Sequence, residues 1–217
     1  MYRLIALLIG YAIGCIQTAY FIGKLHGIDI REHGSKNAGM TNVTRTIGKR
    51  AGAFVFAVDI LKGVAAFIIP MIIFRNEAFI FCAHRGCVYI SHIHQISSAL
   101  PGMYGTFGAI LGHCFPVMLK FRGGKGVSCF LLLPFLIDWR VGLVALVIGL
   151  IGFIPTRYIS LGSLIYTFMA VVAMVLFGHQ FEAIILMTVI TVLIWFLHRE
   201  NIKRLLSGTE RKFLSKK

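Results

Sequence analysis

Acidic residues are scarce in this sequence, and charged residues of either sign are few. Its 217 residues include 8 Asp and Glu against 22 Lys and Arg, and only 14% are charged. Hydrophobic residues make up 58% and the mean hydropathy is +0.83, which is more apolar side chain than one soluble core of this size can bury. The composition therefore excludes an ordinary soluble domain and predicts an integral membrane protein.

A cleavable signal peptide and a cluster of carboxylates are also missing. The first apolar segment, residues 4–23, is about one span long and lacks a small-residue cleavage site, so we expect a retained helix. The carboxylates expected on the cytoplasmic side are dispersed: Asp29, Glu32, Asp59, Glu200 and Glu210. Because a magnesium site needs several oxygen ligands brought together, we predict no metal ion and no cofactor.

What the sequence does contain is a series of apolar runs, which predict an all-α polytopic membrane protein. They place seven transmembrane helices near residues 3–23, 52–74, 102–119, 126–137, 141–154, 160–177 and 181–197. The fourth and fifth are short. They are either separate helices joined at residues 138–140 or one long span over 126–154.

The distribution of Lys and Arg decides between these topologies, because basic residues collect in cytoplasmic loops. With seven spans, the N-terminus outside and the C-terminus cytoplasmic, one face receives Lys24, Arg31, Lys36, Arg45, Lys49, Arg50, Lys120, Arg122, Lys125, Arg157, Arg199, Lys203, Arg204, Arg211, Lys212, Lys216 and Lys217. The other face receives only Arg3, Arg75, Arg85 and Arg140. Merging the fourth and fifth spans would separate the basic tail from the basic loops. We therefore predict seven spans in a single domain over residues 1–217, with a longer outside loop at about 75–100.

The formal net charge of +14 has its simplest explanation in this topology. A basic cytoplasmic face orients the protein and contacts anionic lipid headgroups, so the charge does not indicate nucleic-acid binding. Three polar clusters on that face nevertheless combine basic residues with groups that bind phosphate.

The first cluster is the segment GSKNAGMTNVTRTIGKR, which begins at Gly34. Glycine lets the backbone turn its N–H groups toward an anion, and Arg45 adds a planar cation. The neutral donors of the segment are Ser35, Asn37, Thr41 and Asn42. This combination predicts phosphate binding.

The second cluster is FRGGKGVS, residues 121–128, in which Gly123, Gly124 and Gly126 surround Lys125. It precedes an apolar run that we expect to be helical, and backbone amides at a helix start form a common phosphate cradle. The spacing is not that of a Walker A loop. Glycines at the ends of transmembrane helices are also common as simple turns, so this motif alone is a weak signal.

The third cluster is the tail HRENIKRLLSGTE, which we expect to be helical from His198 to about residues 207–208. His198 and Asn201 stand three residues apart and share a helix face. Glu200 and Arg204 stand four apart and could pair beside them. A basic juxtamembrane tail is more often a lipid anchor than a catalytic element.

A weaker fourth element is Ser163, at the cytoplasmic start of the sixth span. Although each cluster has a structural explanation, their presence on one side of the membrane favours a binding site for phosphate groups.

Five segments resemble the acyl-phosphate:glycerol-3-phosphate acyltransferases, the PlsY family of the bacterial inner membrane. They are GSKNAGMTNVTRTIGK at 34–49, DILKG at 59–63, GHCFPVMLKFRGGKGV at 112–127, SLGS at 160–163 and HRENIKRLLSGTE at 198–210. The resemblance follows the family's order over essentially the whole chain.

The resemblance implies transfer of a fatty acyl group from acyl phosphate to the 1-hydroxyl of glycerol 3-phosphate, giving lysophosphatidate and phosphate. The active site would face the cytoplasm in contact with membrane lipids. Whether the enzyme that makes the acyl phosphate docks on the basic face stays open. The residues implied in catalysis are His198, Ser35, Arg45 and Lys125. The residues implied in substrate or phosphate binding are Gly34, Asn37, Thr41, Asn42, Gly123, Gly124, Gly126, Ser163 and Asn201.

Phosphate is a good leaving group once its charge is met, so we expect catalysis by positioning and charge stabilisation through Lys125, Arg45 and backbone N–H groups. The base is open between two alternatives. His198 is the obvious side chain, whereas the resemblance implies that a substrate phosphate can take the proton with His198 as a ligand. Acylation of Ser35 is less favoured, because the only histidine near it in sequence is His33.

Other classes of protein are disfavoured. No histidine precedes an aspartate by five positions, so the His-x-x-x-x-Asp pair of the acyl-CoA-dependent glycerolipid acyltransferases is missing. A transporter for an anionic solute needs polar residues at mid-membrane depth, and the fifth and seventh spans have almost none. A structural scaffold would not need Ser, Asn and Gly in its loops.

Two features depart from the family pattern. The first loop usually reads closer to GSGNPGATN, so Lys36 stands where glycine would be freer. The outside loop holds Cys82 and Cys87, which could form a disulfide or remain free thiols. It also holds His84, His92 and His94, for which metal binding is a disfavoured alternative.

Inside the spans we expect structural roles. Asp59 and Lys62 share a helix face and should pair with each other, with a substrate role as the less favoured alternative. His113 and Pro116 should shape a kink. The segments GYAIG at 10–14 and GAILG at 108–112 should let two helices approach closely.

Overall fold

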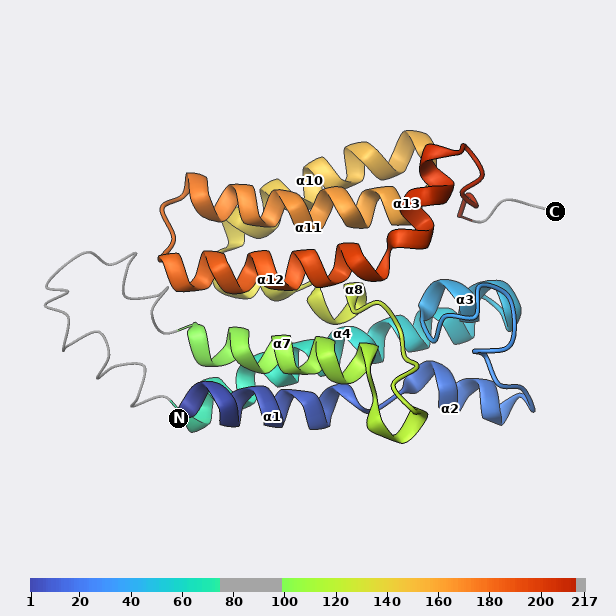
Figure 1. The fold of residues 1–217 in the computed structure, drawn as a ribbon, viewed down its shortest axis with the longest axis horizontal. Helices are drawn as coiled ribbons and strands as arrows, with labels where there is room; N and C mark the ends of the chain where they lie inside the picture. Colours follow the sequence, from blue (N-terminus) through green and yellow to red (C-terminus); the bar gives the residue numbers. More distant parts are fainter. Residues whose placement is uncertain (75–98, 214–217) are drawn as a thin grey trace, which may run out of the picture. The chain divides into compact units, whose positions relative to one another are not determined.

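The computed structural model describes residues 1–74 and 99–213, and all regular secondary structure in these ranges is helical (Figure 1). The segment that holds Cys82, Cys87 and the three histidines of the predicted outside loop is not among the described residues. Residues 1–74 and 99–133 form one compact unit, and the chain from Pro134 onward forms a second. The helical content agrees with the predicted all-α fold.

The first unit combines long apolar helices with short segments that carry polar loops. Its elements are α1 (Tyr2–Gly14), α2 (Thr18–Leu25), α3 (Met40–Thr46), α4 (Lys49–Ile73), α7 (Leu100–Cys114), the 3-10 helix η1 (Val117–Leu119) and α8 (Val127–Phe130). Pro101 stands in the first turn of α7, where the missing N–H of proline costs no helical hydrogen bond. α7 ends two residues before Pro116, so the predicted kink is a complete end of the helix.

The second unit is made almost entirely of helix. Its elements are α9 (Leu133–Ile137), which begins at the boundary, and α10 (Trp139–Thr156), α11 (Ile159–Leu176), α12 (Phe181–Leu197) and α13 (Arg199–Leu206). Gly178 and Gly208 both have φ of 69°, the left-handed conformation with which glycine commonly follows the end of a helix. Each of them turns the chain soon after α11 or α13 ends.

The structure confirms a multi-pass membrane architecture. Five segments are long and apolar enough to cross a membrane: Tyr2–Leu25, Lys49–Ile73, Leu100–Leu119, Trp139–Thr156 and Ile159–Leu176. The pair α12 and α13, bent by 63° where the two helices meet, is a sixth candidate. Five or six segments of the described chain thus meet this length and hydropathy criterion, so the predicted count of seven is not confirmed by it.

The difference lies in the predicted fourth span, residues 126–137. Here the chain forms α8 and α9, and the apolar stretch Val127–Ile137 would extend about 17 Å as a helix, against a hydrocarbon core of about 30 Å. The alternative of one long span over 126–154 is excluded. Asp138 has an extended backbone after α9, and its side chain accepts a hydrogen bond from the Arg140 N–H to cap α10.

The predicted first span is broken in the middle. α1 ends at Gly14, α2 begins at Thr18, and the side chain of Gln17 between them is buried. Its Nε2 lies 3.2 Å from the carbonyl oxygens of Gly14 and His113 and 3.3 Å from that of Gly112. Gln17 thus supplies donors to carbonyl groups at the ends of α1 and α7, which lack partners within their own helices.

α1 and α7 pack backbone against backbone, as the small-residue segments predicted. A Cβ atom at Gly10 would overlap the carbonyl oxygen of Gly105, and one at Gly112 would overlap that of Tyr11. The Tyr11 hydroxyl donates to the carbonyl oxygen of Phe115 at 2.8 Å. Close approach of these two helices therefore requires small residues on both.

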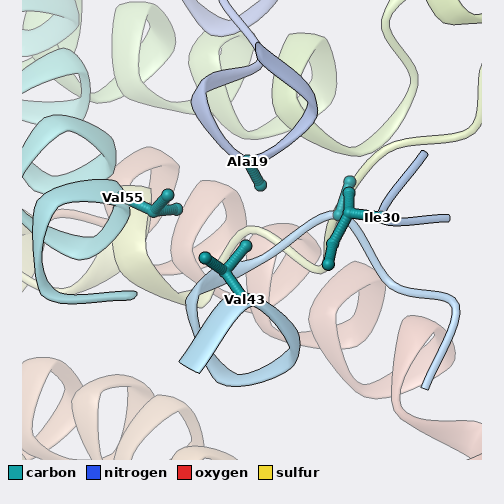
Figure 2. Packing of buried hydrophobic residues seen from close by; sticks show 5 residues of the cluster. Ala19, Ile30, Val43 and Val55 are labelled. Atoms are coloured by element: carbon teal, nitrogen blue, oxygen red, sulfur yellow. The ribbon is translucent and has the colours of Figure 1, made fainter. Parts of the chain in front are cut away.

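A small apolar core lies beneath the loop that joins α2 to α3. Figure 2 shows Ala19 of α2, Ile30 of the loop, Val43 of α3 and Val55 of α4 gathered around one point, and Ala38 belongs to the same cluster. Each fully buried valine or isoleucine side chain contributes about 1.5–3 kcal/mol. Apolar residues thus anchor a loop whose other residues are largely polar.

Candidate active site

The loop between α2 and α3 is folded around the side chain of Asn42. Its Oδ1 accepts a hydrogen bond from the Ser35 N–H at 2.9 Å, and its Nδ2 donates to the carbonyl oxygens of Ile30 and His33, both at 2.9 Å. Asn42 is fully buried. The sequence predicted it as a phosphate ligand, but in this structure its amide faces the loop backbone and holds the loop in shape.

Three residues of this loop have a left-handed backbone, namely Gly27 with φ of 72°, Gly34 with φ of 62° and Lys36 with φ of 58°. A Cβ atom at Gly34 would overlap Oδ1 of Asn42, so only glycine fits there. Lys36 adopts the conformation at a cost of about 1–2 kcal/mol. The structure thus gives a physical reason for the glycine that the family pattern has at this position.

The other predicted ligands of the first cluster lie nearer the surface. Ser35 and Arg45 are exposed, and Asn37 and Thr41 are half-buried. Arg45 stands in the last turn of α3, so this helix fixes its backbone near the loop. These four residues are placed where a water-soluble anion can reach them.

Arg31 joins this loop to the segment that precedes the second cluster. Its guanidinium lies 2.7 Å from Oδ2 of Asp29 and donates to the carbonyl oxygen of Leu119 at 3.2 Å. The side-chain hydrogen bond from Arg31 lowers the pKa of Asp29 to about 2. The pair therefore stays charged at neutral pH and holds the two segments together.

The second cluster, the GGKG loop of residues 123–126, runs back along the end of α7. The Gly123 N–H donates to the carbonyl oxygen of Cys114 at 3.1 Å, and the Gly124 N–H donates to that of His113 at 3.0 Å. The sequence predicted these amides as part of a phosphate cradle, but here they anchor the loop. Lys125 is half-buried, and Gly126, with φ of 83°, directly precedes α8.

The structure brings the first and second clusters together in the first unit. A Cβ atom at Gly124 would overlap Nε2 of His113 and would lie 2.9 Å from the carbonyl oxygen of Ala38. Gly124 is therefore sandwiched between the end of α7 and the loop that carries Ser35 and Asn37. The two predicted clusters are neighbours although about eighty residues separate them in the sequence.

In the second unit, His198 stands at the bend between α12 and α13 and is 5% exposed. Its Nδ1 lies 2.8 Å from the carbonyl oxygen of Ile194. Because a carbonyl can only accept, Nδ1 carries the hydrogen, and Nε2 of the neutral ring is an acceptor. Such a ring can accept a hydrogen bond or take a proton at Nε2.

The two predicted ligands that accompany His198 make hydrogen bonds within the same unit. Asn201 Nδ2 donates to Oε1 of Glu210 at 2.7 Å, and the Ser163 hydroxyl donates to the carbonyl oxygen of Ile159 at 2.8 Å. The helix predicted from His198 to about residue 207 is confirmed as α13, with His198 as its N-terminal cap residue.

Glu210 is the residue of this region that the sequence interpretation missed. Its carboxylate accepts hydrogen bonds from Ser160 at 2.8 Å, from Asn201 at 2.7 Å and from Arg204 at 2.7 Å. Burial alone would raise the pKa of Glu210, but these three bonds outweigh burial and lower it. A charged Glu210 therefore ties the chain after α13 to α11 and α13.

The predicted pair of Glu200 and Arg204 is wrong. Glu200 lies 3.3 Å from Lys203 on the exposed face of α13, and Arg204 pairs with Glu210 instead. The available signal was Gly208, whose left-handed backbone turns the chain back toward α13. The four-residue spacing of a helix indicates partners within the same helix only, so it did not indicate Glu210, which lies beyond the end of α13.

Among residues 1–74 and 99–213, no group of three or more His, Cys, Asp or Glu side chains is placed to hold a metal ion. The described features define a class of protein, namely a multi-pass membrane protein with two basic, glycine-containing loops that pack together. These loops carry exposed and half-buried polar donors.

Comparisons with known proteins assign the family. Residues 4–208 match the Glycerol-3-phosphate acyltransferase family. The chain is 38% identical over 213 residues to the glycerol-3-phosphate acyltransferase of Thermoanaerobacter sp. (strain X514), which covers 98% of this chain and 96% of the relative. It is 35% identical over 215 residues to that of Clostridioides difficile (strain 630), covering 99% and 97%.

Two solved structures that resemble this chain support the same family. The crystal structure of PlsY (YgiH), an integral membrane glycerol 3-phosphate acyltransferase, in its glycerol 3-phosphate form has a TM-score of 0.79 and 34% identity, covering 98% of this chain and 96% of that one. The lysophosphatidic acid form has a TM-score of 0.75 and 33% identity, covering 98% and 95%. The chain therefore belongs to the PlsY family of glycerol-3-phosphate acyltransferases.

Proposed function

We propose that this protein transfers a fatty acyl group from an acyl phosphate to the 1-hydroxyl of glycerol 3-phosphate and releases lysophosphatidate and inorganic phosphate. Family membership supports glycerol-3-phosphate acyltransferase activity, and the solved relatives are a glycerol 3-phosphate form and a lysophosphatidic acid form. The observation that carries the proposal is the packing of the two predicted phosphate-binding loops against each other at Gly124.

The chemistry needs positioning and charge stabilisation more than a covalent intermediate. The hydroxyl oxygen of glycerol 3-phosphate attacks the acyl carbonyl carbon, the bond from that carbon to the phosphate oxygen breaks, and phosphate leaves with the bonding electrons. Arg45 and Lys125 supply the cations that stabilise the phosphate groups. Ser35, Asn37 and Thr41 supply neutral donors, and Asn42 acts by holding the loop that presents them.

The hydroxyl proton goes either to Nε2 of His198 or to a substrate phosphate. The hydrogen bond from Nδ1 of His198 to the Ile194 carbonyl leaves Nε2 of the neutral ring as an acceptor, which a base needs. As a ligand, this neutral ring would accept from the substrate hydroxyl, and only a protonated ring would donate to a phosphate. Binding roles for Ser163 and Asn201 are proposed from the family resemblance of residues 160–163 and 198–210. Acylation of Ser35 remains the least favoured route.

Acyl phosphate is proposed as the donor because the resemblance implies it and because no histidine here precedes an aspartate by five positions. The test incubates the purified protein with palmitoyl phosphate and glycerol 3-phosphate and measures phosphate and lysophosphatidate. We expect both products in equal amounts, and we expect palmitoyl-CoA to give none. Phosphate release that does not depend on glycerol 3-phosphate would contradict the proposal.

Arg45 and Lys125 should be needed for turnover but not for folding. Arg45→Ala and Lys125→Ala should each lower kcat by about 10²–10³-fold, the typical loss when one group that stabilises transition-state charge is removed. Lys24→Ala is the matched control, because Lys24 is an exposed basic residue of α2 in the same unit and lies outside the predicted clusters. Full activity of both test variants, or equal loss in the control, would contradict the assigned roles.

We also propose that the protein lies in the bacterial inner membrane with seven crossings, the N-terminus outside and the C-terminus and active site cytoplasmic. This topology counts the short segment Val127–Ile137 as a crossing element beside the six longer candidates. Its support is the distribution of Lys and Arg between the loops.

A further inference from the structure

Three ionisable side chains that the proposed reaction does not use are buried in the first unit. Asp59 and Lys62 belong to α4 and His113 belongs to α7, and none is more than 5% exposed. Nζ of Lys62 lies 2.8 Å from Oδ1 of Asp59, which confirms the predicted pair, and 2.9 Å from Nδ1 of His113. Ionisable groups inside membrane-spanning helices are costly, so a cluster of three indicates a function.

The contacts fix the state of the His113 ring. Nζ of Lys62 also donates to the carbonyl oxygen of Ile16 at 2.9 Å, at the break between α1 and α2. An ammonium group has only hydrogens to offer, so Nδ1 of His113 must accept from it. The hydrogen of the neutral ring is therefore on Nε2, the atom that lies against Gly124.

The same residue supports the GGKG loop through its backbone. The carbonyl oxygen of His113 accepts from the Gly124 N–H at 3.0 Å and from Nε2 of Gln17 at 3.2 Å. The ring of His113 fills the space on the side of Gly124 where a Cβ atom would stand. The cluster of Asp59, Lys62 and His113 thus lies directly behind the loop that presents Lys125.

We infer that Asp59, Lys62 and His113 are positioning residues, which hold His113 in one tautomer and one orientation and thereby set the conformation of the GGKG loop. The consequence for Lys125 rests on the proposed function, whereas the consequence for the loop does not. Lys62 transmits the constraint because it joins α4, the break between α1 and α2, and the end of α7. A displacement of about 1 Å in a positioning element can cost about a hundredfold in rate.

The first experiment separates positioning from packing. Lys62→Met alone would leave the Asp59 charge buried without its partner and could simply unfold the protein. The double variant Asp59→Asn with Lys62→Met removes both charges at nearly constant volume, and such replacements are often tolerated by the fold. We expect a melting temperature near that of the parent, but a kcat that falls about a hundredfold with palmitoyl phosphate and glycerol 3-phosphate. Activity within about twofold of the parent would overturn the inference.

A second pair of variants covers the case in which the double variant does not fold. His113→Asn keeps an acceptor close to the position of Nδ1, whereas His113→Leu has none. We expect His113→Asn to retain at least about ten times the kcat of His113→Leu at a similar melting temperature, because the acceptor for Lys62 is the group that matters. Equal activities of these two variants would contradict the inference.

A third measurement does not require activity. In hydrogen exchange followed by mass spectrometry, peptides containing Gly123 and Gly124 should exchange faster in the His113→Leu variant and in the double variant than in the parent. A peptide from α11 in the second unit should be unchanged. Unchanged exchange at residues 123–124 would overturn the inference, even if the parent protein proved inactive and the proposed function failed.

Discussion

Lys36 shows how one residue can depart from a family pattern at a measurable cost. With φ of 58° it holds a left-handed backbone that costs a lysine about 1–2 kcal/mol. Lys36→Gly would remove this cost, but glycine loses more conformational entropy on folding, by about 0.5–1 kcal/mol. We therefore expect a net stabilisation of up to about 1 kcal/mol, measured as a raised melting temperature in detergent.

The matched control for this prediction is Lys49→Gly. Lys49 is also exposed, but it begins α4 with a helical backbone, so glycine relieves no strain there. Lys49→Gly should be neutral or destabilising. If Lys36→Gly lowers the melting temperature as much as the control does, the left-handed conformation of Lys36 is not the source of strain.

Glu210 should make the stability of the second unit depend on pH. Its folded-state pKa is lowered, because the hydrogen bonds from Asn201, Arg204 and Ser160 outweigh the effect of burial. A carboxylate of this kind stabilises the fold above its unfolded pKa of about 4.3, and that contribution is lost as the pH falls through the lower folded pKa. The melting temperature of the parent should therefore decrease below about pH 4.3.

Glu210→Gln tests this assignment. A glutamine amide cannot serve all three donors, and it leaves Arg204 without its anion, so we expect a loss of about 1–3 kcal/mol at neutral pH and a flatter dependence of melting temperature on acid pH. Glu200→Gln is the control, because its partner Lys203 is exposed and such surface pairs contribute about 0–1 kcal/mol. Equal effects of the two substitutions would contradict the role of Glu210.

At the scale of helices, the contact of α1 with α7 depends on the absence of side chains. A Cβ atom at Gly10 would overlap the carbonyl oxygen of Gly105. Gly10→Ala should therefore push the two helices apart and destabilise the protein by about 1–3 kcal/mol, the usual cost of overpacking. Leu8→Ala is the control on the same helix, since Leu8 is 55% exposed and should change stability by less than about 0.5 kcal/mol. A melting temperature for Gly10→Ala equal to that of the control would show that the helices adapt.

The sequence predicted the ends of α10, α11 and α12 well. α12 occupies residues 181–197 as predicted, and α10 and α11 differ from prediction by one or two residues at each end. The break at residues 15–17 was missed, because hydropathy does not show that Gln17 is stabilised by carbonyl groups of α7 that are distant in the sequence. The apolar composition of residues 126–137 predicted one helix there, whereas the chain forms two short helices, α8 and α9, since composition does not show where a helix breaks.

The candidate site was predictable in its residue types more than in its bonding. The sequence indicated which loops carry donors and cations, and the structure packs two of those loops together at Gly124. The sequence could not show that Asn42, Gly123 and Gly124 form hydrogen bonds with other groups of the protein, because these bonds depend on how the loops fold. Glu210 was missed for the same reason.

At the scale of the whole molecule, each unit gathers basic loops at one end. In the first unit, Arg31 donates to the carbonyl oxygen of Leu119, so the basic loop after α2 meets the segment that leads to Lys125. In the second unit, the Phe213 N–H donates to the carbonyl oxygen of Arg157, so the basic tail meets the connection between α10 and α11. If these loops are cytoplasmic, as we propose, each unit must bring its basic segments to one side in this way.

The proposed seven crossings make a prediction about sides that does not depend on the relative placement of the units. If Val127–Ile137 crosses, residue 50 and the C-terminus lie on the same side, because an even number of crossings separates them. If it does not cross, they lie on opposite sides. We expect a fluorescent protein fused after residue 50 or after residue 217 to fluoresce in the cytoplasm, and alkaline phosphatase fused after Asp138 to be active. Activity of alkaline phosphatase at the C-terminus, with fluorescence retained at residue 50, would show that the short apolar segment does not cross the membrane.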